Sequence, residues 1–469
     1  MKKCAVIFLL WLSNTWLLAS TTPNVTVTPF HTNLKDINHY SEGFVDIFST
    51  GILINIFRMD TGITGHHAGN NGCIVRRFSF DDGLTWTNPV VIYSDSLDDR
   101  NISGGIIEGE RVVVFFRRYE SVYSNHVDFN MIFSDDGGYT WSERQEVNTN
   151  GISSYSQKIF QIHGRGYYTS FYNINYFELR YSVDGLNWDS VVAEWDYRLT
   201  MDFKTSESSF VYLNNGVIYG LIRNENKLLG NNFYYTISYD AGITWTTLEQ
   251  TNIGNGFWCP SPSMYYDMEN QVLWIVTADR RGLFLPYHFH QDSQIWIYGT
   301  YVFDIYNNPS QHNLIESRLR PFPNFYQTYG YHSMVRLPNG NIYVIGTEST
   351  KRIENFLEWA WFYDFYINYN SPVSSPLTTQ HRMFEVTSIG PNPFINDLYV
   401  VYTGEEEIPS EMIIVIFDAK GMVVFEKKIE TCSASEIPVF DKGYILPAGL
   451  YTAQIQYRDN KYVRKLVKI

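Results

Sequence analysis

The chain has 469 residues, of which 17% are aromatic and 18% are charged, and its formal net charge at pH 7 is −14. This composition is typical of a β-rich secreted protein with stacking surfaces. The negative charge argues against a nucleic-acid-binding protein, but it is compatible with an anionic ligand because a local group of arginines can dominate its own pocket.

The first 20 residues have the pattern of a secretory signal peptide. Lys2 and Lys3 precede an apolar run, and the segment ends in the small residues Ala19 and Ser20, as such peptides do before their cleavage site. Cys4 lies too early to be a lipid-modified cysteine at the cleavage point. We therefore expect a soluble secreted product.

Four short segments repeat one pattern, in which Ser and Asp are followed by Gly and then Trp. They are residues 79–86, 134–141, 182–188 and 238–245, and they begin roughly 50 residues apart, the period of propeller blades. In such an Asp box the Ser and Asp side chains can bond the turn backbone, Gly supplies a positive φ, and Trp packs into the blade. We therefore expect the boxes to be structural.

Turn signals alternate with the Asp boxes along the chain. They are Thr50-Gly51, Glu108-Gly109, His163-Gly164, Asn215-Gly216, Glu269-Asn270 and Asn339-Gly340. A turn followed by an Asp box marks the first and third connections of a four-stranded blade. Residues 21–370 are thus predicted to form an all-β, six-bladed β-propeller. Because these two connections share one face, we expect the open ends of the hairpins on the opposite face.

Two of the predicted hairpins carry reactive side chains at their open ends. Folding about Asn215 places Glu207 opposite Arg223, and folding about the Asn-Gly turn at 339–340 places Tyr331 opposite Glu348. If the hairpins are arranged radially, these carboxylates, the guanidinium and the phenol share one site.

Together the Asp boxes and these hairpins resemble the sialidase (neuraminidase) superfamily over roughly residues 31–370. The resemblance implies a retaining exo-glycosidase for terminal acidic sugars, with a tyrosine nucleophile in place of the usual carboxylate. It assigns Tyr331 as the nucleophile, Glu207 as its partner and Glu348 as a brace for an arginine. Arg223 and either Arg280 or Arg281 would bind the substrate carboxylate.

The first blade departs from the sialidase pattern, because residues 40–46 lack the usual arginine. Arg58 is the candidate replacement, since it follows Gly51 by the same spacing that separates Arg223 from Gly216. Arg117 is a further candidate for substrate binding.

The general acid is expected on the loop that follows Arg58, where Asp60, His66 and the adjacent His67 are candidates.

Two other functions remain open. One is a glycan-binding propeller without catalysis, and the other is a hydrolase or lyase for a different acidic polysaccharide.

Residues 371–384 have the composition of a linker, and residues 385–469 are predicted to form a separate small β-sandwich-like domain. The segments Gly390-Pro-Asn-Pro-Phe394, Pro447-Ala-Gly-Leu-Tyr451 and the terminal Lys465-Leu-Val-Lys-Ile469 resemble the sorting domain of type IX secretion cargo. The resemblance implies secretion or display at the cell surface, with the export machinery as a partner.

No cofactor or metal is expected. After signal removal Cys73, Cys259 and Cys432 remain, and they are scattered and odd in number. The partner expected beyond the export machinery is a carbohydrate substrate, with no nucleic acid and no membrane span.

Overall fold

The computed structural model describes most of the chain in two compact units, which divide between Pro372 and Val373. The described residues are 25–29, 31–61, 71–120, 125–149, 155–162, 164–200, 204–225, 232–254, 261–278, 294–312, 315–319, 327–351 and 358–369, followed by 385–390, 398–403, 412–418, 422–429, 436–440, 446–447, 449–457 and 460–468. The predicted signal peptide 1–20 and linker 371–384 lie outside them. Each unit is all-β apart from short helical turns, as predicted.

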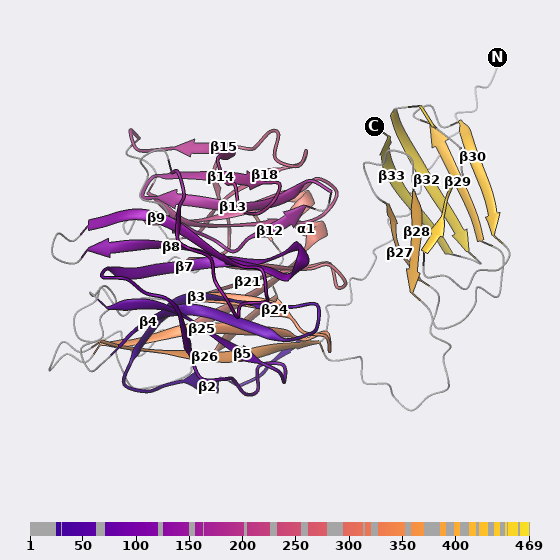
Figure 1. Ribbon diagram of the computed structural model, residues 1–469. Helices are drawn as coiled ribbons and strands as arrows, with labels where there is room; N and C mark the ends of the chain where they lie inside the picture. The colour runs from indigo at the N-terminus through magenta and orange to yellow at the C-terminus, as the bar shows by residue number, and fades with distance from the viewer. Residues whose placement is uncertain are drawn as a thin grey trace, which may run out of the picture. The chain divides into compact units, whose positions relative to one another are not determined.

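The described strands of the first unit form six antiparallel sheets (Figure 1). In chain order, the first three contain β3 (His39–Ile47), β4 (Leu53–Asp60), β5 (Gly72–Ser79) and β6 (Val90–Tyr93); β7 (Asp98–Ile107), β8 (Arg111–Glu120), β9 (Asn125–Ser134) and β10 (Gln145–Glu146); and β11 (Tyr155–Ser156), β12 (Phe160–Ile162), β13 (Gly166–Asn173), β14 (Tyr176–Ser182) and β15 (Ser190–Asp196). A 3-10 turn, η1 (Glu108–Glu110), joins β7 to β8.

The other three sheets repeat this plan. They contain β16 (Thr205–Tyr212), β17 (Ile218–Asn224), β18 (Tyr234–Ser238) and β19 (Glu249–Gln250); β20 (Ser263–Asp267), β21 (Val272–Ala278), β22 (Ile295–Tyr301) and β23 (Ile315–Leu319), with the short helix α1 (Val302–Asn307); and β24 (Gln327–Arg336), β25 (Ile342–Lys351) and β26 (Glu358–Tyr369). The N-terminal strands β1 (Val25–Val27) and β2 (His31–Leu34) pair with β26, so the two ends of this unit meet in one sheet.

The core of the first unit lies between the faces of successive sheets. A buried apolar cluster joins the first and second sheets through Ile56 and Val114, and comparable clusters follow between each later pair. A cluster containing Phe57 and Tyr343 joins the sixth sheet to the first. The strands that begin the sheets also make contact in order, and β24 contacts β3. The sheets therefore succeed one another around a closed circuit.

The Asp-box turns have the structural role that the sequence predicts. In the first box, Ser79 Oγ accepts the Gly83 N–H at 2.9 Å, Asp81 accepts the Thr85 N–H at 2.8 Å, and Trp86 Nε1 donates to the Gly83 carbonyl at 3.1 Å. The three later boxes repeat the bonds to Ser, Asp and Gly. Each box follows the third strand of its sheet, as expected, when β11 and β12, which both pair with β13, are counted as one.

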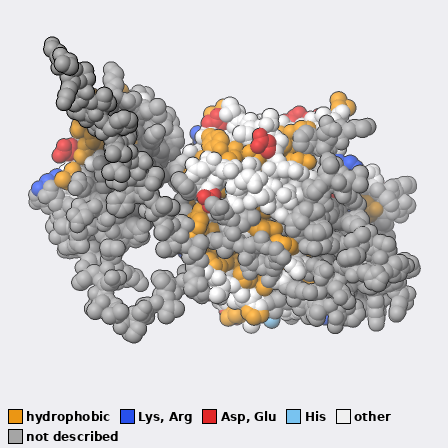
Figure 2. Space-filling model, turned by 180° about the vertical axis from the view of Figure 1, so that it is seen from behind, with side chains coloured by type: hydrophobic (Ala, Val, Ile, Leu, Met, Phe, Trp, Pro, Cys, Tyr) orange, Lys and Arg blue, Asp and Glu red, His pale blue; other side chains and the backbone are white. Residues whose placement is uncertain are grey.

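The surface seen in Figure 2 is mostly apolar or uncharged where residues are described, and its acidic side chains are scattered. The negative net charge of the chain is therefore not gathered into one patch on this described face.

The described strands of the second unit form two sheets. One contains β27 (Glu385–Gly390), β28 (Tyr399–Thr403) and β31 (Glu436–Pro438), and the other contains β30 (Val423–Ile429), β29 (Met412–Asp418), β32 (Gly449–Tyr457) and β33 (Asn460–Lys468). Their shared core includes Leu398, Ile414 and Ile455. Across the described parts of both units, no helix has the length and apolar character needed to cross a membrane.

Candidate active site

A β-bulge interrupts the first strand of four sheets, near its beginning. The regular pairing is displaced by one residue at 41–43 in β3, 100–103 in β7, 205–208 in β16 and 330–333 in β24. Glu42, Asn101 and Tyr331 occupy these bulges with φ values of 44°, 56° and 52°. Bulges re-aim side chains and are frequent next to active sites, so these four strand ends define the candidate site.

Glu207 lies in the bulge of β16 and forms an ion pair with Arg223 on β17. The register predicted about Asn215 is confirmed, because Tyr212 pairs with Ile218. Arg223 also contacts Glu225 Oε1 at 3.1 Å. Sequence reasoning missed Glu225, although its two-residue spacing from Arg223 on an extended strand was a signal for it.

Tyr331 is electrostatically coupled to the same arginine. Burial lowers the pKa of Arg223, but the Glu207 and Glu225 carboxylates and the Tyr331 phenol raise it, and the net shift is upward. The phenol therefore lies within electrostatic range of the Glu207–Arg223 pair. Residues from the fourth and sixth sheets thus converge, as the radial arrangement predicts.

The predicted pairing of Tyr331 with Glu348 is wrong. Glu348 pairs with Tyr329. The pairing beside the turn is already one residue away from the predicted register, since Arg336 pairs with Ile342, and the bulge displaces it by one more. His332 in this bulge contacts the Tyr363 hydroxyl at 2.5 Å. A Cβ on Gly346 would lie 2.7 Å from His332 and equally near the Tyr363 hydroxyl, so glycine makes room for this contact. Glu348 itself is buried.

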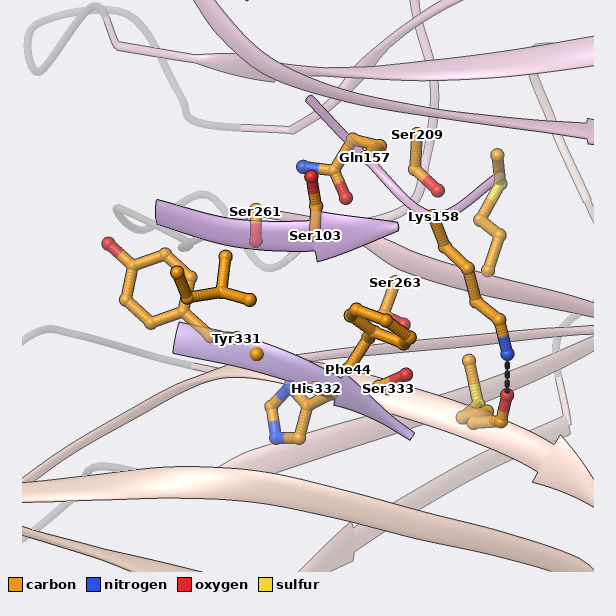
Figure 3. A pocket seen from close by; sticks show the side chains of 14 residues that line it. Phe44, Ser103, Gln157, Lys158, Ser209, Ser261, Ser263, Tyr331, His332 and Ser333 are labelled. Atoms are coloured by element: carbon orange, nitrogen blue, oxygen red, sulfur yellow. Dashed lines mark hydrogen bonds between the residues drawn. The ribbon is translucent and has the colours of Figure 1, made fainter. Parts of the chain in front are cut away.

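The Tyr331 ring lies at the edge of a small cavity of about 40 Å³ (Figure 3). Its lining includes Ser103, Ser209 and Ser263 from three different sheets. Lys158 also lines it and donates to the carbonyls of Val45 at 3.0 Å and Met334 at 3.2 Å. A cavity of this size holds a few water molecules, so a sugar ring must lie outside it.

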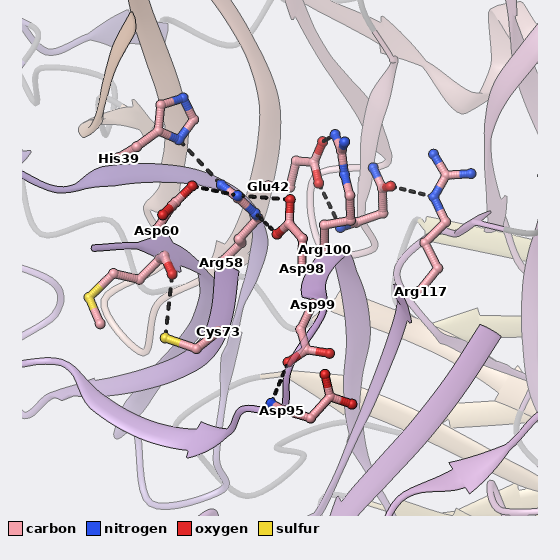
Figure 4. A network of polar contacts seen from close by, with 12 residues as sticks. His39, Glu42, Arg58, Asp60, Cys73, Asp95, Asp98, Asp99, Arg100 and Arg117 are labelled. Atoms are coloured by element: carbon pink, nitrogen blue, oxygen red, sulfur yellow. Dashed lines mark hydrogen bonds and ion pairs between the residues drawn. The ribbon is translucent and has the colours of Figure 1, made fainter. Parts of the chain in front are cut away.

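Arg58 lies beside the bulge of the first sheet, and Arg223 has the corresponding position in the fourth sheet. Its environment is different (Figure 4). Arg58 is fully buried, its Nε donates to Asp98 Oδ1 at 2.6 Å, and its Nη2 donates to Asp98 Oδ2 at 3.0 Å and to Asp60 Oδ2 at 3.1 Å. Burial lowers the pKa of Arg58, and Asp98, Asp60 and Glu42 raise it, with a net upward shift.

Glycine makes this arginine–carboxylate pair possible. A Cβ on Gly72 would lie 1.8 Å from Asp98 Oδ1 and 2.6 Å from Arg58 Nε. Asp98 comes from the second sheet, which is why the spacing that identified Arg58 gave no hint of its partner. Asp60, a candidate acid, is 3% exposed and bonded to Arg58 in this structure.

Arg117 lies on β8, partly exposed, with its Nε bonded to the Asn101 side chain. The remaining predicted site residues, His66, His67, Arg280 and Arg281, lie outside the described residues. Glu42 and Asn101 were missed by sequence reasoning, because only the bulges bring them to this face. Among the described residues, no group of three or more His, Cys, Asp or Glu side chains is arranged to hold a metal ion.

The C-terminal part of the chain matches a known family. Residues 388–469 match the secretion system C-terminal sorting domain. This match confirms the predicted sorting signal, and the chain is therefore directed by type IX secretion to the cell surface or the extracellular space.

No curated protein matches the chain in sequence. Among solved structures, a protein of unknown function from Dyadobacter fermentans DSM 18053 is similar, with 15% identity, a TM-score of 0.58 and coverage of 74% of this chain and 100% of its own. The phage phi92 endosialidase has 12% identity, a TM-score of 0.54 and coverage of 95% and 88%. These likenesses show a shared fold.

The hemagglutinin-neuraminidase of parainfluenza virus 5 is more distant, with 8% identity, a TM-score of 0.45 and coverage of 74% of this chain and 95% of its own. A likeness at this level bears on neither the mechanism nor the substrate.

Proposed function

We propose that this chain is an exported glycoside hydrolase that removes terminal acidic sugars, of the sialic acid type, from glycans with retention of configuration. We also propose that its six sheets are the blades of a β-propeller whose bulged strand ends form the active site. The single observation that carries the proposal is the buried ion pair between Arg223 and Glu207 at the bulge of β16. In support, burial lowers the pKa of Arg223, but Glu207, Glu225 and the Tyr331 phenol raise it by more.

The proposed chemistry follows from three kinds of group, namely a carboxylate, a guanidinium and a phenol. The Tyr331 oxygen attacks the anomeric carbon, the bond to the leaving oxygen breaks, and the phenolic proton passes to the Glu207 carboxylate. Arg223 stabilises negative charge near the phenolic oxygen. Water then attacks the anomeric carbon and breaks the glycosyl–tyrosine bond. One water proton passes to the group that protonated the leaving oxygen, and the proton held by Glu207 returns to the phenolic oxygen, so the sugar is released and the phenol is restored.

A neutral nucleophile suits an acidic sugar. A carboxylate nucleophile would be repelled by a carboxylate next to the reacting carbon, whereas a phenol approaches without charge. Arginines at the bulged strand ends would orient the substrate carboxylate through paired N–H donors. For the leaving oxygen, Asp60 and His66 remain the proposed proton donors.

A second function is favoured by a specific observation. Arg58 and Asp60 are bonded to one another within a buried network, so a propeller that binds acidic glycans without cleaving them also fits. Such a protein would bind an acidic glycan saturably and form no product. A lyase for an acidic polysaccharide would instead leave an unsaturated sugar that absorbs ultraviolet light.

The test is product analysis with the secreted protein from residue 21. Sialyllactose and an oligosaccharide rich in uronic acid are incubated with it, and products are followed by NMR and ultraviolet absorbance. Our proposal predicts free sialic acid, released first as the anomer with retained configuration. Inverted product, an unsaturated product, or binding without product would each contradict it.

A further inference from the structure

The bulges of the first and second sheets are joined by one buried carboxylate. Glu42 is fully buried, and its Oε2 accepts the backbone N–H of Asn101 at 2.6 Å. Its other oxygen accepts a bond from Arg100 Nη2 at 3.4 Å. Figure 4 shows Glu42 beside Arg100. A buried carboxylate needs such partners, and here they come from the bulged strand of the neighbouring sheet.

Asn101 extends this contact toward solvent. Its side-chain oxygen accepts a hydrogen bond from Arg117 Nε. Asn is among the residues that tolerate a positive φ, so it can fill the bulge and present its amide to Arg117. A series of hydrogen bonds therefore connects Glu42, through the backbone and side chain of Asn101, to the guanidinium of Arg117.

Arg100 and Arg117 lie in the same cationic neighbourhood. Burial lowers the pKa of His126 to about 3, and the charges of Arg117 and Arg100 lower it as well. Arg100 lies over the Tyr119 ring at 5.6 Å and is only 6% exposed, whereas Arg117 is partly exposed. Glu42 balances the charge of Arg100, so with His126 neutral it is the guanidinium of Arg117 that adds a positive charge suited to an anion.

Arg58 differs from Arg117 in its access to solvent. Its guanidinium is fully buried against Asp98 and Asp60, and breaking a buried pair is strongly unfavourable because it leaves an uncompensated charge. A substrate carboxylate therefore reaches Arg117 more readily than Arg58.

We propose that Arg117 contacts the substrate carboxylate at the position first assigned to Arg58, and that Glu42 and Asn101 are positioning residues that hold it there. Arg58 then serves to anchor Asp98 and the start of β7. This inference rests on the proposed function in one respect, namely that the ligand is an acidic glycan.

The test uses the full secreted chain and five variants, of which Arg117→Lys is the conservative one. Arg117→Ala removes the guanidinium, and Glu42→Gln removes the buried charge. Asn101→Gly keeps the positive φ and removes only the side chain. Arg118→Ala is the matched control, because Arg118 is adjacent on β8 but pairs with Asp128 and Asp95 instead. Thermal unfolding of each variant verifies that it folds.

Binding of sialyllactose and of neutral lactose is measured by calorimetry, and kcat and KM are measured on a fluorogenic sialoside. We expect Arg117→Ala and Asn101→Gly to weaken sialyllactose binding at least about tenfold and to leave lactose unchanged. Glu42→Gln should act mainly on KM, and Arg117→Lys should restore part of the affinity. Arg118→Ala should match the unaltered protein.

The outcomes separate this inference from the proposed function. Arg117-dependent binding without turnover overturns the hydrolase and supports the arginine assignment. Turnover that is unaffected by Arg117→Ala and Asn101→Gly supports the hydrolase and overturns the assignment. If the unaltered protein binds neither sialyllactose nor an oligosaccharide of uronic acids, both are overturned.

Discussion

The two ends of the sheets in the first unit differ in what they repeat. At the end that carries the Asp boxes, the same Ser, Asp, Gly and Trp contacts recur in four sheets. At the opposite end a bulge recurs in four sheets, but its side chains differ: Glu42, Asn101, Glu207 and Tyr331. Repeated side chains indicate a shared structural task, whereas a repeated backbone with different side chains indicates a scaffold on which chemistry has diverged.

The largest effect is expected for Tyr331→Phe at the bulged end. Removing the phenolic oxygen removes the nucleophile and leaves the ring, so turnover should fall by about a thousandfold or more with little change in stability. Steady-state kinetics on a sialoside, with thermal unfolding of the same samples, measures both. A variant that keeps its turnover would remove Tyr331 from the mechanism.

The titration of Asp99, near the bulge of β7, should lower the stability of the fold as pH rises. Burial, and then Asp95 and Asp98, raise its pKa to about 8, and its Oδ1 finds no hydrogen-bond partner among the described residues. The folded protein keeps this proton between about pH 4 and 8 while the unfolded chain releases it, so stability falls across that window.

Asp99→Asn removes this titration. Its gain in stability over the unaltered protein should therefore grow from pH 4 to pH 8, reaching the order of a few kcal/mol. Urea unfolding at several pH values measures the difference, and two curves that stay parallel across the window would contradict the prediction.

A smaller effect is expected for Gly138→Ala in the second Asp box. Gly138 has a φ of 91°, and a Cβ there would lie 2.8 Å from Ile54 Cδ1. We expect a loss of about 1–3 kcal/mol in unfolding free energy and unchanged turnover. Gly164→Ala is the control, because Gly164 also has a positive φ but no atom within 4 Å of the added Cβ. A change in kcat for Gly138→Ala would contradict the purely structural role that we assign to the Asp-box end of the sheets.

Local turn chemistry explains what could be predicted from the sequence. The Asp boxes and the Asn-Gly turns depend on residues within a few positions of one another, so the hairpins and the Glu207–Arg223 pair follow from the chain itself. The sorting domain was predicted from short motifs and is confirmed by its family match.

Contacts between sheets explain what was missed. The bulge at Tyr331 is held by His332, Tyr363 and Gly346, and it displaces the partner of Glu348 by one residue. The Arg58 guanidinium is held by Asp98, 40 positions further along the chain. A register counted outward from a turn contains no information on either contact, because both depend on how neighbouring strands and sheets pack.

The most direct test of the mechanism is to trap its covalent intermediate. The secreted protein is treated with a fluorinated sialoside that forms the glycosyl–enzyme bond but hydrolyses slowly, and the labelled peptide is sequenced by mass spectrometry. Our account predicts one sugar on Tyr331 and no label in Tyr331→Phe. A label on another residue, or complete conversion of a natural sialoside with no trapped species, would contradict it.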